Sequence, residues 1–196
     1  MQRRSFMRKS TAALALVGLA LVGCTTNRNA GSEQAAGAAD LHRSIDADVD
    51  STLQRLYTTV SGSRELVAKA SGVLVFPSVI QAGFVVGAQY GKGSLRAGGH
   101  TVGYYSTTSG SVGLQAGAQS KAIIFLFMTQ DALTKFRSSN GWSAGADASV
   151  ALVRMGANGT IDTTTASKPV QAFVLTNAGL MADASLEGTK VSRLTE

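Results

Sequence analysis

Residues 141–145, Gly-Trp-Ser-Ala-Gly, match the G-x-S-x-G nucleophile elbow, in which the serine attacks an acyl substrate. That chemistry needs a buried strand before the motif and a histidine base after the serine. The four residues before the motif are polar, and His42 and His100 both precede Ser143. The start of a glycine-rich strand with a packed Trp142 explains the motif better, so a hydrolase would rest on Ser143 alone, and we expect no catalytic residues.

Asp46, Asp48 and Asp50 alternate like the first ligands of a calcium loop, but Ser51 stands where the loop needs glycine and Tyr57 where it needs glutamate. Their helical spacing instead indicates the solvated face of a helix. Neither histidine belongs to a cluster of carboxylates or thiols. We therefore expect no metal and no cofactor.

The single cysteine, Cys24, has the clearest chemistry. It follows a basic segment (residues 1–9) and an apolar segment (residues 11–22) that is too short to span a bilayer but has the length of a signal-peptide core. The sequence Leu-Val-Gly-Cys24 resembles a bacterial lipobox, whose cysteine accepts diacylglycerol. We expect residues 1–23 to be removed and Cys24 to be acylated, palmitate included. The alternative is an ordinary secretory signal with a chance cysteine.

The residues around Cys24 predict where the protein resides. Thr25, rather than aspartate, follows the lipobox, and lipoprotein sorting rules then favour the outer membrane of the bacterial envelope, facing the periplasm or the surface. Arg3 and Arg4 fit either a twin-arginine signal or an ordinary basic segment. Residues 24–40 are polar and small, which predicts a flexible tether between the lipid and a domain over residues 41–196.

Composition narrows the class of partner. The chain has 196 residues, enough for one domain with a tail. Four of its 18 basic residues lie in the first nine positions, so most of the excess over the 12 acidic residues belongs to the leader. A folded domain with so little net charge lacks the basic stripe of nucleic-acid-binding proteins. One cysteine also rules out an internal disulfide framework.

Hydrophobic periodicity predicts the helices. Apolar residues recur at spacings of three and four over residues 45–60, which favours a helix packed on a core, with a membrane-surface helix as the alternative. Asp46, Asp48, Asp50, Gln54 and Arg55 fall on its opposite face. Short helices are predicted from Ser63, over residues 130–138 and after Gly179.

The region after Gly72 predicts an α+β, β-rich fold: a curled antiparallel sheet, barrel-like or sandwich-like, of short glycine-rich strands. A turn is expected at residues 107–110. Glycines four apart place one face of small residues on a strand, which allows close approach or strong curvature. The predicted strands are 72–77, 81–93, 99–106, 110–119, 121–128, 141–155 and 170–176.

Eight segments together resemble the SYLF domain over residues 41–194, through their order and combined length. They are Gly72-Val-Leu-Val-Phe-Pro77, Ala82-Gly-Phe-Val-Val-Gly87, Tyr90-Gly-Lys-Gly93, Gly103-Tyr-Tyr105, Gly113-Leu-Gln-Ala-Gly-Ala-Gln119, Gly141-Trp142, Gly179-Leu-Met181 and Leu186-Glu-Gly188. The family is known for lipid binding, especially phosphoinositides and other anionic lipids in eukaryotic members. A yeast member also binds actin, which a bacterial lipoprotein does not meet in its own cell.

The resemblance implies a non-enzymatic lipid-binding domain, here of a membrane-anchored lipoprotein. Candidate headgroup ligands are Lys69, Lys92 and Arg96, which lie near glycine-rich backbone. The expected partners are membrane lipids, as covalent anchor and as bound ligand, and no nucleic acid. The alternative is a structural or protein-interaction lipoprotein of the envelope that binds a protein partner along a sheet edge.

Overall fold

The computed structural model describes residues 30–83, 86–112, 119–156, 161, 168–182 and 184–195. The predicted signal peptide, Cys24 and the glycines at 113 and 117 lie outside these residues. None of the helices in the described ranges is both long and apolar enough to cross a bilayer.

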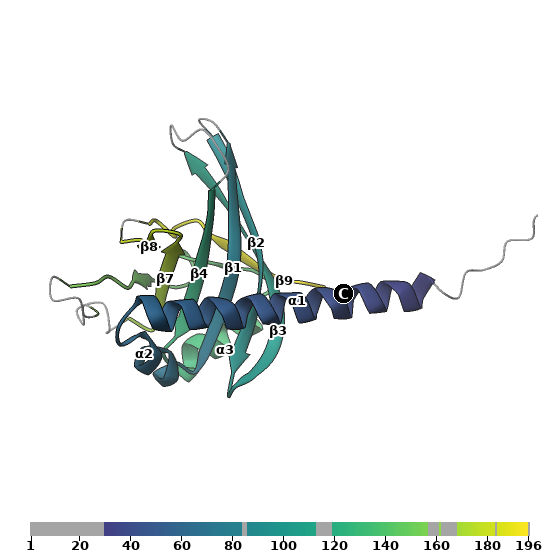
Figure 1. The fold of residues 1–196 in the computed structure, drawn as a ribbon, viewed down its shortest axis with the longest axis horizontal. Coiled ribbons are helices and arrows are strands. Elements are labelled where there is room, and N and C mark those ends of the chain that lie inside the picture. The colour runs from purple at the N-terminus through teal and green to yellow at the C-terminus, as the bar shows by residue number, and fades with distance from the viewer. Residues whose placement is uncertain are drawn as a thin grey trace, which may run out of the picture.

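The described residues form one curled sheet with helices on both faces, which confirms the predicted β-rich α+β class (Figure 1). The helices are α1 (Ala30–Thr59), α2 (Ser63–Lys69) and α3 (Gln130–Ser138). The long strands are β1 (Gly72–Gly83), β2 (Val86–Ala97), β3 (His100–Val112), β4 (Gln119–Phe127) and β7 (Val170–Thr176). The short strands are β5 (Trp142–Ser143), β6 (Val150–Leu152), β8 (Gly179–Leu180) and β9 (Lys190–Arg193).

The strand order is β5-β9-β3-β2-β1-β4-β7-β6, with β8 beside β7. Neighbouring strands run antiparallel, apart from the parallel pair β6–β7. The consecutive strands β1 to β4 are the tallest part of the sheet, and α1 crosses them on one face (Figure 1). The N-terminal part of α1 projects beyond the sheet edge.

Each face of the sheet carries its own hydrophobic core. On one face, Ile45, Val49 and Leu56 of α1 pack against residues such as Val75 and Ile124. On the other face, α3 closes a core rich in aromatic side chains: Phe76, Phe125, Phe127, Phe136 and Trp142. The alternation of side chains along β4 places its even-numbered apolar residues in the first core and its odd-numbered ones in the second.

Several predicted boundaries differ from the structure. Residues 30–40, expected to be a flexible tether, form the start of α1, since this alanine-rich stretch has high helix propensity. The predicted turn at residues 107–110 lies inside β3, where pairing with β2 on one side overrides the polar composition. The predicted strand 81–93 contains the end of β1 and the start of β2. The region after Gly179 has a short strand and no helix among its described residues.

β1 is irregular at the point where Gly93 of β2 lies close to it. The register of β1 shifts between Val75 and Ser78 in its pairing with β2 and between Phe76 and Val79 in its pairing with β4, and Pro77 lies within both irregularities. Opposite it, a Cβ on Gly93 would lie 1.9 Å from the carbonyl oxygen of Val75 and 2.8 Å from the ring of Phe76. Only a glycine fits at position 93, which supports the expectation that glycines permit close approach.

We predict that Gly93→Ala destabilises the domain by about 3 kcal/mol, the upper end of the usual cost of overpacking, because the backbone of β1 must move. Gly110→Ala on β3 is the matched control, since a Cβ there meets no atom within 4 Å. Chemical denaturation of both variants measures the difference. Equal stability of the two would contradict the close approach at Gly93.

Candidate functional site

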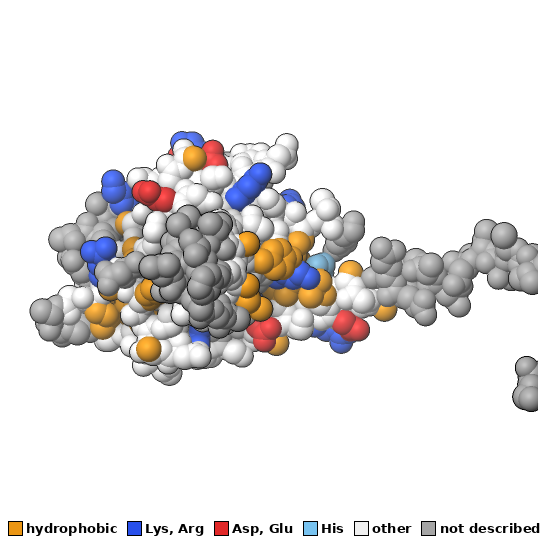
Figure 2. All heavy atoms as spheres, turned by 90° about the horizontal axis from the view of Figure 1, so that it is seen from above, with side chains coloured by type: hydrophobic (Ala, Val, Ile, Leu, Met, Phe, Trp, Pro, Cys, Tyr) orange, Lys and Arg blue, Asp and Glu red, His pale blue; other side chains and the backbone are white. Residues whose placement is uncertain are grey.

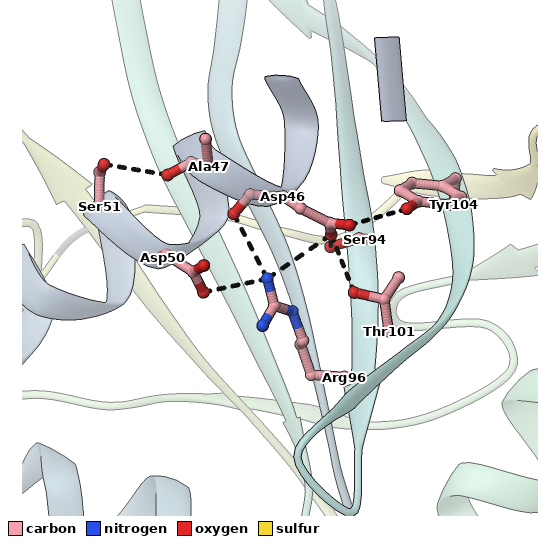
Figure 3. A network of polar contacts seen from close by, with 8 residues as sticks. All are labelled: Asp46, Ala47, Asp50, Ser51, Ser94, Arg96, Thr101 and Tyr104. Atoms are coloured by element: carbon pink, nitrogen blue, oxygen red, sulfur yellow. Dashed lines mark hydrogen bonds and ion pairs between the residues drawn. The ribbon is translucent and has the colours of Figure 1, made fainter. Parts of the chain in front are cut away.

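A polar network holds α1 on the sheet, and Asp46 is at its centre (Figure 3). Two hydroxyl groups donate to Asp46 Oδ1, from Ser94 at 3.0 Å and from Thr101 at 2.9 Å. The Tyr104 hydroxyl donates to Asp46 Oδ2 at 2.8 Å. The three donors come from β2 and β3, so one carboxylate ties the helix to two strands. We call Asp46, Ser94, Arg96, Thr101 and Tyr104 the clasp.

Arg96 adds charge to the clasp. Its Nη2 lies 3.5 Å from Asp46 Oδ1 and 3.0 Å from Asp50 Oδ1, and it donates to the carbonyl oxygen of Asp46 at 3.3 Å. One guanidinium therefore joins two carboxylates that are one helical turn apart on α1. The imidazole of His42, one turn earlier, stacks on Tyr104 with ring centroids 3.7 Å apart.

The clasp shifts the titration of its central carboxylate. Partial burial on its own would raise the pKa of Asp46. The hydrogen bonds from Tyr104, Thr101 and Ser94, together with the charge of Arg96, outweigh that effect and hold the pKa of Asp46 below its ordinary value. The ionised form therefore stabilises the attachment of α1.

A groove runs beside α1, where β1 and β2 extend beyond the helix. Ile80 and Tyr90 face each other across these two strands and are 54% and 48% exposed. Leu41 of α1, 37% exposed, lines the same groove, whose volume is about 270 Å³. Three of the five large hydrophobic side chains found exposed among the described residues thus gather at one place. Figure 2 shows hydrophobic side chains gathered on this side of the domain, with basic side chains near them.

Polar side chains line the same groove. Lys92 and Ser78 pair across β2 and β1, in the row of residues next to Ile80 and Tyr90. Ser44 and Asp48 contribute from α1. The groove is therefore amphipathic, with hydrocarbon surface, hydroxyl groups and two opposite charges on its walls. We call it the α1 groove.

The three candidate headgroup ligands do not meet in one site. Lys92 lines the α1 groove, whereas Lys69 ends α2. Arg96 lines a different hollow, between α2 and the β2–β3 turn, and its charge is directed to Asp46 and Asp50. Lys92 is therefore the candidate that lines the α1 groove and forms no ion pair among the described residues.

The G-x-S-x-G segment has a structural explanation. Ser143 lies in β5 opposite Lys190, its backbone N–H donates to Asp147, and Trp142 is buried in the aromatic core. Among the described residues, no group of three or more histidine, cysteine, aspartate or glutamate side chains is arranged to hold a metal ion.

Sequence reasoning missed the clasp. It placed Asp46 with Asp48 and Asp50 on the solvated face, and this is wrong for Asp46, which points to the sheet. Asp46 lies next to Ile45 on the edge of the apolar stripe, so helical spacing alone was compatible with its facing the sheet. Its hydroxyl donors lie about 50 residues further along the chain, and no local pattern connects them to it.

Part of the chain matches a known protein family. Residues 108–196 match the family model Ysc84, described as Las17-binding protein actin regulator. This part of the chain matches the SYLF domain family, for which Ysc84 is another name. No curated protein matches the chain.

The SYLF match confirms the resemblance seen in the sequence, and the matched residues begin within β3 and include β4, α3 and β7. The SYLF family is one of binding domains and is not known for enzymes. The clasp residues and the α1 groove precede residue 108, so they belong to the part of the chain outside the match.

We predict that Asp46→Asn destabilises the protein by about 2 kcal/mol at pH 7, because charge-assisted hydrogen bonds and the Arg96 pair are lost. The pKa of Asp46 is lowered in the folded state, so its stabilising effect is present above the unfolded-state pKa, near 4, and is lost as the pH falls through the folded-state value. The stability gap between wild type and variant should therefore shrink below about pH 4. Urea denaturation at pH 7 and pH 3 measures it.

Asp48→Asn is the matched control, since Asp48 lies half a turn away, is exposed, and forms no ion pair within the described ranges. Its stability should stay within about 0.5 kcal/mol of wild type at pH 7. An Asp46→Asn variant as stable as this control would show that the clasp does not hold α1.

Proposed function

We propose that this protein is a non-enzymatic lipid-binding domain carried by a membrane-anchored bacterial lipoprotein. The observation that carries the proposal is the α1 groove, which combines exposed Leu41, Ile80 and Tyr90 with the ammonium of Lys92. The match to a family of binding domains supports the same class of function.

The groove suits a lipid because its apolar walls can contact the hydrocarbon of the lipid and its basic side chain can contact the headgroup. Ile80 and Tyr90 can bury hydrocarbon, and each apolar Å² removed from water contributes about 25 cal/mol. Lys92 is only partly exposed, and within the described residues it forms no ion pair. Its charge is therefore available to a phosphate, as lysine commonly is in phosphate sites.

The anchor brings this groove to a membrane. With Cys24 acylated, five residues separate the lipid from the start of α1 and reach at most about 18 Å. Leu41 then follows about three turns along the helix. We place the domain at the bacterial envelope, at the outer membrane, because Thr25 follows Cys24.

A protein partner is the second candidate, and one feature of the sheet favours it. β9 pairs with residues 105–108 of β3, so residues 109–112 have β2 on one side and no described strand on the other. Such an edge accepts an added strand. Cross-linking in cells that traps one protein, with no lipid kept on native purification, would favour this alternative.

We predict that Ile80→Asp lowers the binding of residues 25–196 to vesicles of equal parts phosphatidylethanolamine and phosphatidylglycerol by about fivefold, roughly 1 kcal/mol of apolar burial. Sedimentation with the vesicles measures it. Met181→Asp is the matched control, since Met181 is exposed and apolar but does not line the groove. Equal losses in both variants, or no binding by wild type, would count against the proposal.

We predict that cells fed labelled palmitate incorporate it into the wild-type chain and not into Cys24→Ser, because a hydroxyl does not replace the thiol in this acylation. Gel fluorography of the immunoprecipitated protein gives the result. A mature product that begins before Cys24 would contradict the predicted acylation of Cys24. Lipid binding by the groove would then be tested separately, by the vesicle sedimentation.

A further inference from the structure

The α1 groove is lined by two opposite charges that form no ion pair with each other. Lys92 enters it from β2 and Asp48 from α1. Over the described part of the chain, neither side chain forms an ion pair or a side-chain hydrogen bond, whereas the nearby Asp46 and Asp50 both engage Arg96. Asp48 is thus the carboxylate of this acidic stretch that is left for a ligand.

These two charges discriminate between classes of headgroup. A headgroup with a net negative charge is attracted by Lys92 and repelled by Asp48, and at similar distances the two effects largely cancel. In a headgroup that carries both a phosphate and an ammonium, the phosphate can pair with Lys92 while the ammonium pairs with Asp48. Charge complementarity therefore favours a zwitterion over an anion.

The ammonium group of the headgroup should be a primary one. A carboxylate accepts strong hydrogen bonds from N–H donors, which a quaternary ammonium does not have. Quaternary ammonium groups are instead recognised by cages of several aromatic rings. Among the residues that the structure describes, Tyr90 is the one aromatic residue that lines this groove.

The remaining walls of the groove favour a ligand that carries hydrocarbon. Leu41, Ile80 and Tyr90 line the same groove as the two charges and are exposed. The hydroxyl groups of Ser44 and Ser78 lie among them, and Ser78 already exchanges a hydrogen bond with Ser120 at 2.9 Å. A free aminoalkyl phosphate would leave this apolar surface in water, so the apolar walls favour a lipid.

We propose that the α1 groove selects a zwitterionic glycerophospholipid of the phosphatidylethanolamine type, with its phosphate at Lys92 and its primary ammonium at Asp48. The inference rests on the proposed lipid-binding function and names the lipid class. It departs from the anionic-lipid preference that the family resemblance implies.

The test is native mass spectrometry of the full chain in detergent, with an equimolar mixture of phosphatidylethanolamine and phosphatidylglycerol of identical acyl chains. We expect wild type to retain more phosphatidylethanolamine. Asp48→Asn should lower the ratio of phosphatidylethanolamine to phosphatidylglycerol adducts by about threefold, the usual effect of one solvent-exposed ion pair. Lys92→Gln should reduce both adducts, because both lipids carry the phosphate.

Asp131→Asn is the control, since Asp131 is an exposed carboxylate on α3, paired with Lys135, and α3 packs on the opposite face of the sheet from the groove. It should leave the adduct ratio unchanged. A wild-type preference for phosphatidylglycerol, or a ratio that Asp48→Asn does not alter, would overturn the selection and leave lipid binding intact. Failure to retain either lipid would overturn the selection together with the proposed function.

Discussion

The attachment of one carboxylate to two strands determines how this molecule is assembled. Apart from the stacking of His42 on Tyr104 and the ion pair of Asp50 with Arg96, the helix that carries Asp46 is held to the sheet mainly by aliphatic side chains, which are compatible with sliding and rotation. Three hydroxyl donors and a guanidinium fix one rotation of α1 and one position along it. A partly buried carboxylate that lost these partners would be costly to keep, so the arrangement is specific as well as stabilising.

The groove is a consequence of this placement. Strands β1 and β2 are longer than the width that α1 covers, and the clasp holds the helix over their lower half (Figure 1). The upper residues on the same face, Ile80 and Tyr90, are therefore left uncovered beside Leu41. Lys92 and Asp48 reach the same hollow from strand and helix. The chemistry of the site thus depends on where the helix stops covering the sheet.

Local patterns predicted those elements whose stability is decided locally. α3 matches the predicted residues because Thr129 caps it and Leu133 and Phe136 follow the helical period. β7 was predicted to the residue because its apolar run is bounded by polar turns. By contrast, the polar residues 107–110 were predicted to be a turn although they are strand, since they pair with residues of β2 that lie 16 to 22 positions earlier, beyond the range of a local turn pattern. Lys92 and Arg96 were both predicted as headgroup ligands from their basic side chains. In the structure, Arg96 instead forms ion pairs with two aspartates of α1.

The sequence by itself determined the class of fold, the apolar stripe of α1, the use of glycine where strands pack closely, and the lone thiol at Cys24. Each of these depends on neighbours within a few residues. The tertiary structure alone decided that Asp46 points inward, that Arg96 is paired, and that Leu41, Ile80 and Tyr90 share one groove. Those facts depend on contacts between segments some 40 to 60 residues apart. Side-chain periodicity assigns a residue to a face, but only the packing of distant elements determines which part of that face is covered.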